Sequence, residues 1–243
     1  MTSNRFFLDK LKIKNRRIYL KGKEHHHLSI VLRKKRGDKI KLFDKEGTNY
    51  EAEIEEVTEK HTLLIISDQK AAHYSGLKIT LAQTLLKSKK FDFILQKSTE
   101  LGISQFVPII SSRTVMKIEE KTEKKMSRWN KIVLEAAKQS GQTQVPSIHF
   151  PVSIENYVKQ YNNELCLFLN EHGGMSLRSL VLKYACSQDK KPPASVTLLC
   201  GPEGGWTEEE EKVILDSHFV AVSLGRYTLR SETAALSSIA VIS

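Results

Sequence analysis

Residues 196–236 read VTLLCGPEGGWTEEEEKVILDSHFVAVSLGRYTLRSETAAL, and their pattern is the strongest indication of the fold class. It predicts an apolar strand at Val196–Cys200, a loop at Gly201–Gly205, a helix, a second strand at Phe219–Leu224, and a loop into a last helix at Thr233–Ile242. Apolar strands that alternate with helices are typical of a parallel sheet covered on both faces. Ligands of such sheets bind beyond the carboxyl ends of the strands, where both loops fall.

The helix between these two strands has a clear start signal. Thr207 is the predicted N-cap, and Glu210 follows three positions later, which is the spacing of a capping box. Glu208 and Glu209 suit the positive end of the helix dipole. The helix is therefore expected to begin directly after the glycine-rich loop.

The loop at Gly201–Gly205 lacks the marks of a phosphate-binding loop. No Lys-Ser or Lys-Thr pair follows its glycines, and they do not form a G-x-G-x-x-G motif. The glycines allow unusual backbone angles and the close approach of a ligand, but a tight strand-to-helix turn is an equal alternative. In the second loop, Arg230 and Glu232 flank Ser231 just before the last helix, which favours a functional role.

Taken together, the two loops resemble the C-terminal signature of the ribosomal RNA small-subunit methyltransferase E family. The matching motifs are Gly201-Pro202-Glu203-Gly204-Gly205, Leu224-Gly225 and Leu229-Arg230-Ser231-Glu232-Thr233-Ala234. Members are SPOUT methyltransferases, and the resemblance implies S-adenosylmethionine-dependent methylation of N3 of a uridine in small-subunit ribosomal RNA. It also implies an α/β fold with a SPOUT-type parallel sheet, a C-terminal trefoil knot and a small N-terminal PUA-like β-barrel. General topology rules alone argue against a knot.

The charge distribution favours an RNA partner. The 243 residues are 40% hydrophobic, as in an ordinary globular protein, and carry a formal net charge of +10. Residues 1–41 hold 14 Lys and Arg against 3 Asp and Glu, whereas residues 170–243 hold 7 against 9. A merely solvated surface usually mixes both signs, so the N-terminal excess indicates contact with RNA phosphates.

Several classes of protein are disfavoured. No apolar run approaches the roughly 18 residues of a membrane span, and the N-terminus lacks the apolar core of a signal peptide. Cys166, Cys186 and Cys200 form no C-x-x-C pair, so neither a disulfide framework nor a zinc site is indicated. The run at 25–27, three histidines, is interpreted as surface or helix-capping residues, because consecutive side chains do not all face one ion. We expect a cytoplasmic protein without a bound metal.

The first 72 residues are expected to form a β-rich RNA-binding domain. Alternating or β-branched patterns predict strands at Arg16–Leu20, Lys39–Phe43, Tyr50–Val57 and Thr62–Ser67. A short helix is expected over His26–Arg33. The polar stretch 68–76 is the predicted linker.

Residues 73–243 are expected to form the methyltransferase domain. The predicted elements are a strand at Lys78–Gln83, a helix at Ser88–Leu101, a strand at Ile103–Ile110, a helix at Thr122–Ser140 and a strand at Leu165–Leu169. This alternation continues into the C-terminal stretch. It predicts an α/β domain with a mostly parallel sheet.

The resemblance runs from Arg5 to the C-terminus and implies positions that bind RNA. Its further motifs are Arg5-Phe6-Phe7, His27-Leu28, Lys97 to Gly102, and Ala136 to Gly141. The implied RNA-binding residues are Arg5, Arg33, Arg113 and Arg226. Two departures stand out: Gln142 replaces a usual arginine, and Tyr227-Thr228 replaces a usual Arg-Ile pair, for which Arg226 is a candidate substitute.

The resemblance also implies a cofactor site and partners. S-adenosylmethionine would lie between three loops, and the implied cofactor-binding residues are Leu169, Leu199, Gly201, Gly204, Gly205, Leu224, Gly225, Leu229, Thr233 and Ala234. The family dimerises through its knotted domain. The expected partners are therefore 16S rRNA in the small ribosomal subunit and a second copy of the chain.

The chemistry points to Arg230 and Glu232 as catalytic residues. A uridine N3–H is a weakly acidic imide, so its proton must be removed and the developing anion stabilised. The guanidinium fork of Arg230 suits the uracil oxygens, and Glu232 is the nearest base or orienter of that arginine. An Arg230–Glu232 ion pair that merely closes the helix is the structural alternative. Two other functions stay open: a non-catalytic RNA-binding or ribosome-assembly factor, and a SPOUT methyltransferase for another RNA position.

Overall fold

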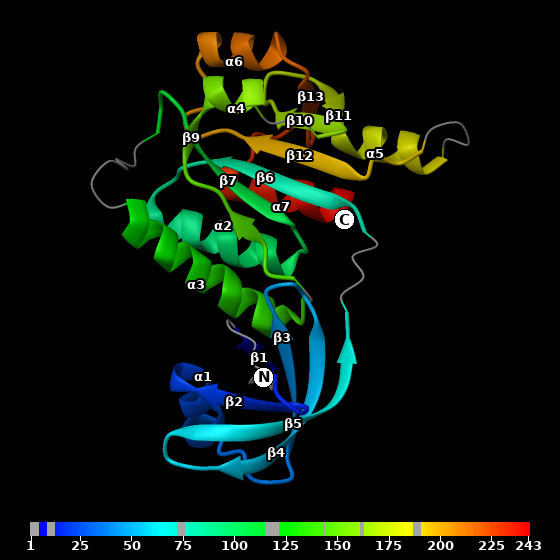
Figure 1. Ribbon diagram of the computed structural model, residues 1–243. Helices are drawn as coiled ribbons and strands as arrows, with labels where there is room; N and C mark the ends of the chain where they lie inside the picture. The colour runs from blue at the N-terminus through cyan, green and yellow to red at the C-terminus, as the bar shows by residue number, and fades with distance from the viewer. Residues whose placement is uncertain are drawn as a thin grey trace. The chain divides into compact units, whose positions relative to one another are not determined.

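The computed structural model describes residues 5–8, 13–71, 76–114, 122–142, 144–160, 163–186 and 191–243 (Figure 1). The chain divides into two compact units. The first unit holds Met1–Tyr74 with Ala137–Val145, and the second holds Ser75–Ala136 with Pro146–Ser243. Each has a hydrophobic core of its own.

The first unit is built on a five-stranded sheet in the order β1-β3-β4-β5-β2. Its strands are β1 (Arg5–Leu8), β2 (Arg17–Lys21), β3 (Lys39–Asp44), β4 (Asn49–Val57) and β5 (His61–Lys70). β1 pairs with β3 in parallel, and the other neighbours are antiparallel. Two register shifts between β4 and β5 are irregularities of the kind that bend a strand pair and increase its twist.

The four predicted strands of this unit are confirmed, with bounds that differ by up to three residues. Strand β1 is absent from the sequence prediction, because four residues give too short a pattern and its partner β3 lies more than 30 positions later. The predicted linker 68–76 is wrong at its start, since Asp68 to Lys70 belong to β5. Residues 72–75 of that linker lie outside the described residues.

A short helical segment fills the gap between β2 and β3. Helix α1 (Gly22–His26) runs directly into a π-helical turn, η1 (His27–Val31), so the helix predicted at His26–Arg33 begins too late. The His25 side chain is buried, and its Nδ1 lies 2.8 Å from Thr62 Oγ1. The surface or capping interpretation is therefore wrong for His25. Successive helical side chains point in different directions, and this one faces the sheet.

The second unit contains an eight-stranded sheet in the order β11-β13-β10-β12-β6-β7-β8, with β9 also beside β7. Its strands are β6 (Lys78–Thr84), β7 (Gln105–Ile110), β8 (Ser147–Ile148), β9 (Val152–Ser153), β10 (Leu165–Leu169), β11 (Met175–Ser176), β12 (Ser195–Cys200) and β13 (Val220–Ser223). Every pairing between its described strands is parallel, which confirms the predicted α/β class. The trefoil knot stays a prediction.

Helices cover both faces of this sheet. The helices of this unit are α2 (Ser88–Glu100), α3 (Thr122–Ser140), α4 (Ile154–Gln160), α5 (Leu177–Cys186), α6 (Glu208–Leu215) and α7 (Ser231–Ile242). The end of α3, from Ala137 on, belongs to the first unit. Helices α2 and α7 contact each other on one face, and α4 and α6 contact each other on the other (Figure 1). The short elements α4, α5, β8, β9 and β11 are missing from the sequence prediction. Among the described helices, none has the length and apolar character needed to cross a membrane.

The predicted capping box at the start of α6 is confirmed. The Glu210 N–H donates to Thr207 Oγ1 at 3.2 Å, and the Thr207 N–H donates to Glu210 Oε2 at 3.0 Å. Glu210 is buried, and its other carboxylate oxygen accepts the N–H of Ser112 at 2.7 Å. The box therefore also ties the start of α6 to the segment that follows β7.

Candidate active site

A cavity of about 260 Å³ lies at the carboxyl ends of neighbouring strands of the second unit. Its wall is formed by the loops that follow β10, β12 and β13, and by Lys90 of α2, which follows β6. These four strands are adjacent in the sheet in the order β13-β10-β12-β6. Parallel neighbours end at the same edge, so loops far apart in the sequence meet there, as the two quoted motifs predict.

Most of the predicted cofactor-binding residues lie in the cavity wall. These are Leu169, Gly201, Gly205, Leu224, Gly225, Leu229 and Ala234. Arg226 and Arg230 belong to the same wall. Leu199, Gly204 and Thr233 do not, and Leu199 is fully buried in the hydrophobic core.

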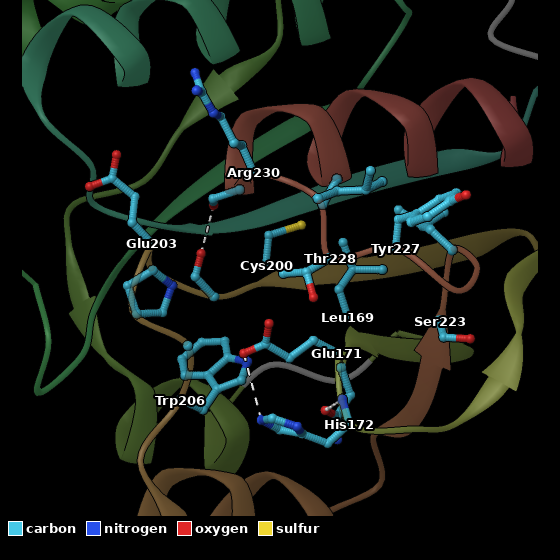
Figure 2. A pocket seen from close by; sticks show the side chains of 18 of the residues that line it. Leu169, Glu171, His172, Cys200, Glu203, Trp206, Ser223, Tyr227, Thr228 and Arg230 are labelled. Atoms are coloured by element: carbon cyan, nitrogen blue, oxygen red, sulfur yellow. Dashed lines mark hydrogen bonds and ion pairs between the residues drawn. The ribbon is translucent and has the colours of Figure 1, made fainter.

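The loop after β10 is fixed by its first residue. The Asn170 N–H donates to the Val222 carbonyl of β13 at 3.0 Å, and its side-chain amide donates to Glu211 Oε1 at 2.5 Å. The following residues, Glu171 and His172, lie beside Trp206 on one side of the cavity, opposite Arg230 (Figure 2). The loop is thus bonded to β13 and α6, the two elements next to it.

The loop after β12 requires glycine at one position at least. Gly205 has φ +72°, and a Cβ added there would lie 3.0 Å from Glu171 Oε1. Arg113 supports this loop from outside, since its guanidinium donates to the carbonyl of Gly204 and, at 3.3 Å, to that of Trp206. The arginine predicted to bind RNA therefore also holds the glycine-rich loop.

A cluster of charged residues stands beside the cavity: Lys90 and Glu203 line it, whereas Glu232, a predicted catalytic residue, does not. The Lys90 ammonium pairs with Glu203 and lies 3.8 Å from Glu232 Oε1. The hydrogen bond with Glu203, together with both carboxylate charges, raises the pKa of Lys90. Among the described residues, Glu232 is paired with Lys90 and not with Arg230, and its Oε2 is buried without a hydrogen-bond partner.

Arg230 is exposed at the rim of the cavity. Figure 2 shows its guanidinium pointing away from the apolar residues of the cavity, on the side of Glu203. It is the N-cap residue of α7, and its carbonyl accepts the Ala234 N–H at 2.8 Å. The main chain of Arg230 is therefore fixed, while its cationic end is available to a molecule that enters from outside.

Tyr227 presents an aromatic ring at the same cavity. Its side chain is 68% exposed. The Arg226 guanidinium lies 4.7 Å from the ring centroid, and its Nη2 donates to the phenol oxygen at 2.6 Å. The sequence departure from the family pattern therefore places a paired arginine and tyrosine in this wall.

Two other chemistries are disfavoured by the residues present. Cys200 lines the cavity, but burial raises the pKa of its thiol well above its usual range, so it stays protonated and is a poor nucleophile. In the described parts of the chain, no three His, Cys, Asp or Glu side chains are grouped so as to hold a metal ion.

The two remaining predicted RNA-binding arginines belong to the first unit, and they differ in exposure and in their contacts. Arg5 donates to Asn49 Oδ1 at 2.7 Å, lies 4.1 Å from the centroid of the Phe43 ring, and has its pKa lowered by burial. Arg33 is exposed, with φ +51°. Both RNA contacts stay predictions, and Arg33 is the one whose side chain is more available.

Several cavity residues are absent from the sequence prediction. They are Lys90, Glu171, His172, Trp206 and Tyr227. Each stands within a few residues of the carboxyl end of a sheet strand. These residues could have been predicted by considering every loop that follows a strand of the sheet, and not only the two loops that carry the motifs.

A parallel sheet with a cavity at the carboxyl ends of its strands is typical of ligand-binding α/β proteins. Residues 73–243 match the family model of the RNA methyltransferase domain, and residues 20–67 match that of the RNA methyltransferase PUA domain. The chain is 32% identical over 226 residues to ribosomal RNA small subunit methyltransferase E of Bacillus subtilis, with 91% of this chain and 88% of that protein covered. The chain belongs to the ribosomal RNA small subunit methyltransferase E family.

Solved structures agree with this membership. The methyltransferase E of Neisseria gonorrhoeae, bound to S-adenosyl methionine, is 30% identical, with a TM-score of 0.83 and coverage of 99% of this chain and 97% of that one. A Legionella pneumophila methyltransferase in complex with the cofactor SAM is also 30% identical, with a TM-score of 0.86 and coverage of 100% and 97%. Both likenesses extend over the whole chain.

Proposed function

We propose that this protein transfers a methyl group from S-adenosylmethionine to N3 of a specific uridine in the 16S ribosomal RNA of the small subunit. The observation that carries the proposal is the meeting of three loops around one cavity beside the exposed Arg230. The names of the relatives support the RNA substrate, and the cofactor in the two solved relatives supports the methyl donor.

The cavity wall fits a nucleoside-bearing cofactor. Leu169, Leu224 and Leu229 supply apolar surface suited to a flat purine ring, and the glycines allow the backbone to approach it. Trp206 Nε1 is buried and has no hydrogen-bond partner among the described residues. An unpaired buried donor in a cavity wall is a reason to expect a polar ligand there.

The residues of the rim suit the chemistry of a uridine N3. When bound, S-adenosylmethionine supplies an electrophilic methyl group on a positively charged sulfur. Loss of the N3 proton spreads negative charge over the two neighbouring carbonyl oxygens, which the Arg230 fork is suited to stabilise. Glu232, which pairs with Lys90 and not with Arg230, is the proposed acceptor of the proton. Lys90 lines the cavity, pairs with Glu203 and lies 3.8 Å from Glu232 Oε1, so it holds the Glu232 carboxylate next to the site.

We also propose a division of labour between the two parts of the chain. Residues 1–72 would act as the RNA-binding domain and residues 73–243 as the methyltransferase domain. The proposed RNA contacts are Arg5, Arg33, Arg113 and Arg226. We further propose that the protein works as a homodimer in the cytoplasm, as its resemblance to the family implies.

Transfer of labelled methyl groups tests the function. Purified protein is incubated with labelled S-adenosylmethionine and small subunits that lack the modification, and digested nucleosides are analysed by mass spectrometry. We expect N3-methyluridine at a single site. Label at another position would instead favour a different RNA target, and cofactor binding without transfer to any RNA would favour a ribosome-assembly factor.

Tyr227 is expected to contribute to RNA binding through base stacking. Stacking of a base on an aromatic side chain contributes roughly 1–3 kcal/mol, so Tyr227→Ala is expected to weaken RNA affinity by about tenfold. Tyr227→Phe keeps the ring and is expected to bind RNA within about threefold of the unchanged protein. Fluorescence anisotropy with a labelled RNA fragment measures both, and equal affinities for the alanine and phenylalanine variants would refute the stacking role.

A further inference from the structure

A buried glutamine stands at the carboxyl end of β6, next to the proposed methyltransferase site. Gln83 is only 1% exposed, although its side chain is a polar amide. Its Nε2 donates to Ser231 Oγ at 3.0 Å, and weaker contacts join it to Thr84. Burial of an amide costs free energy unless its groups are hydrogen-bonded, so these contacts explain only how the donor is accommodated.

The bond from Gln83 continues into the glycine-rich loop. Ser231 Oγ donates in turn to the carbonyl oxygen of Gly201 at 2.7 Å. A hydroxyl has one hydrogen, and because Ser231 accepts from the amide it is free to give that hydrogen to the carbonyl. Gln83 thereby orients the Ser231 hydroxyl, and the hydroxyl joins the start of α7 to the first glycine of the loop.

These hydrogen bonds lie next to the proposed site. Gly201 begins the loop that forms one side of the cavity, and Ser231 stands between Arg230 and Glu232, the two proposed catalytic residues. The second amide atom of Gln83, Oε1, is buried without a partner in the described part of the structure. A polar side chain kept at this cost is poorly explained by packing alone, because an apolar side chain of similar volume would avoid the penalty.

We propose that Gln83 is a positioning residue of the methyltransferase site. Through Ser231 it holds the loop at Gly201–Gly205 against the N-terminus of α7, so that the cofactor-binding wall and Arg230 keep a fixed relation. This inference rests on the proposed function. It assigns Gln83 no contact with either substrate.

The test compares cofactor affinity across a double-mutant cycle in the full chain. S-adenosylmethionine binding is measured by calorimetry for Gln83→Met, Ser231→Ala and the double variant. We expect each single variant to bind about tenfold more weakly, equivalent to about 1.4 kcal/mol. Because both changes break the same chain of bonds, the double variant is expected to lose little more than either single one.

A glutamine on the neighbouring strand provides the matched control. Gln105 lies on β7 at the other end of the sheet, where it pairs in register with Thr80, and its amide contacts His149. Gln105→Met also removes an amide from the second unit, and we expect its cofactor affinity to stay within about twofold of the unchanged protein, because the site is at the opposite edge. Thermal unfolding of all variants separates lost affinity from lost stability.

The outcomes distinguish this inference from the proposed function. If the unchanged protein binds no S-adenosylmethionine, the proposed function fails. If it binds but Gln83→Met binds equally well, or if the two single losses add fully, the positioning role is wrong. Should Gln83→Met fail to fold, Gln83→Asn keeps the amide but shortens its reach, and unchanged affinity in that variant overturns the proposal.

Discussion

Arg230→Met is expected to lower the rate constant of methyl transfer by about 100- to 1,000-fold, the usual cost of removing one donor to a developing anion. Arg230 is exposed at the cavity rim, so its loss should leave the fold intact. S-adenosylmethionine binding is expected to persist within about threefold, because the apolar wall and the glycine loop are unchanged. Single-turnover transfer of labelled methyl to saturating RNA, beside calorimetry of the cofactor, measures the two effects separately.

Two neighbouring substitutions sharpen this prediction. Arg230→Lys keeps the charge but not the planar fork, so its rate is expected to fall between those of the methionine variant and the unchanged protein. Arg226→Met removes an arginine of the same loop whose guanidinium is engaged with Tyr227, and it should weaken RNA binding more than the transfer step. A transfer rate for Arg230→Met within threefold of the unchanged protein would show that this arginine does not act on the reacting base.

Gly174→Ala is expected to lower the free energy of unfolding by about 2–4 kcal/mol, because it combines a strained backbone with overpacking. Gly174 has φ +122°, and an added Cβ would lie 2.7 Å from the backbone carbon and oxygen of Ala221. Those atoms belong to β13 and have little freedom to move. The loop that ends at Gly174 also carries Glu171 and His172, so cofactor affinity is expected to fall with stability.

The adjacent glycine is the control for this effect. Gly173 also has a positive φ, +149°, but no atom lies within 4 Å of its added Cβ. Gly173→Ala therefore carries the conformational strain without the collision, and we expect it to cost about 1–2 kcal/mol. Urea unfolding followed by tryptophan fluorescence measures both variants. An equal decrease in the free energy of unfolding for the two variants would mean that β13 shifts to accommodate the extra methyl group.

Local sequence patterns were sufficient to predict the strands and the helix start that surround the site. The apolar runs that form β10 and β12 are continuous because a parallel strand inside the sheet is buried on both faces, and that requirement is visible in the sequence. β13 is apolar as well but only partly buried. The Thr207–Glu210 capping box is equally local, since both partners stand within four residues. For the same reason, the quoted motifs mark two of the three loops that meet at the cavity, those after β12 and β13.

Very short elements and long-range contacts could not be predicted from the sequence. Strand β1 depends on its partner β3, and the burial of His25 depends on Thr62, 37 positions away. In the site, Glu232 is paired with Lys90 and not with the neighbouring Arg230. The periodic pattern of apolar residues does not predict such contacts, because each forms only when segments far apart in the sequence come together.

The fold class, the glycine-rich loop and Arg230 at the cavity were thus predictable from local patterns, because strand burial, helix capping and turn chemistry act over a few residues. Which other side chains share the site depends on how the chain folds in three dimensions. Gln83 and Ser231 are 148 positions apart and meet because β6 lies beside β12 in the sheet, so that both segments reach Gly201 at one edge. Strand order, which arises from the packing of the whole sheet, sets those contacts.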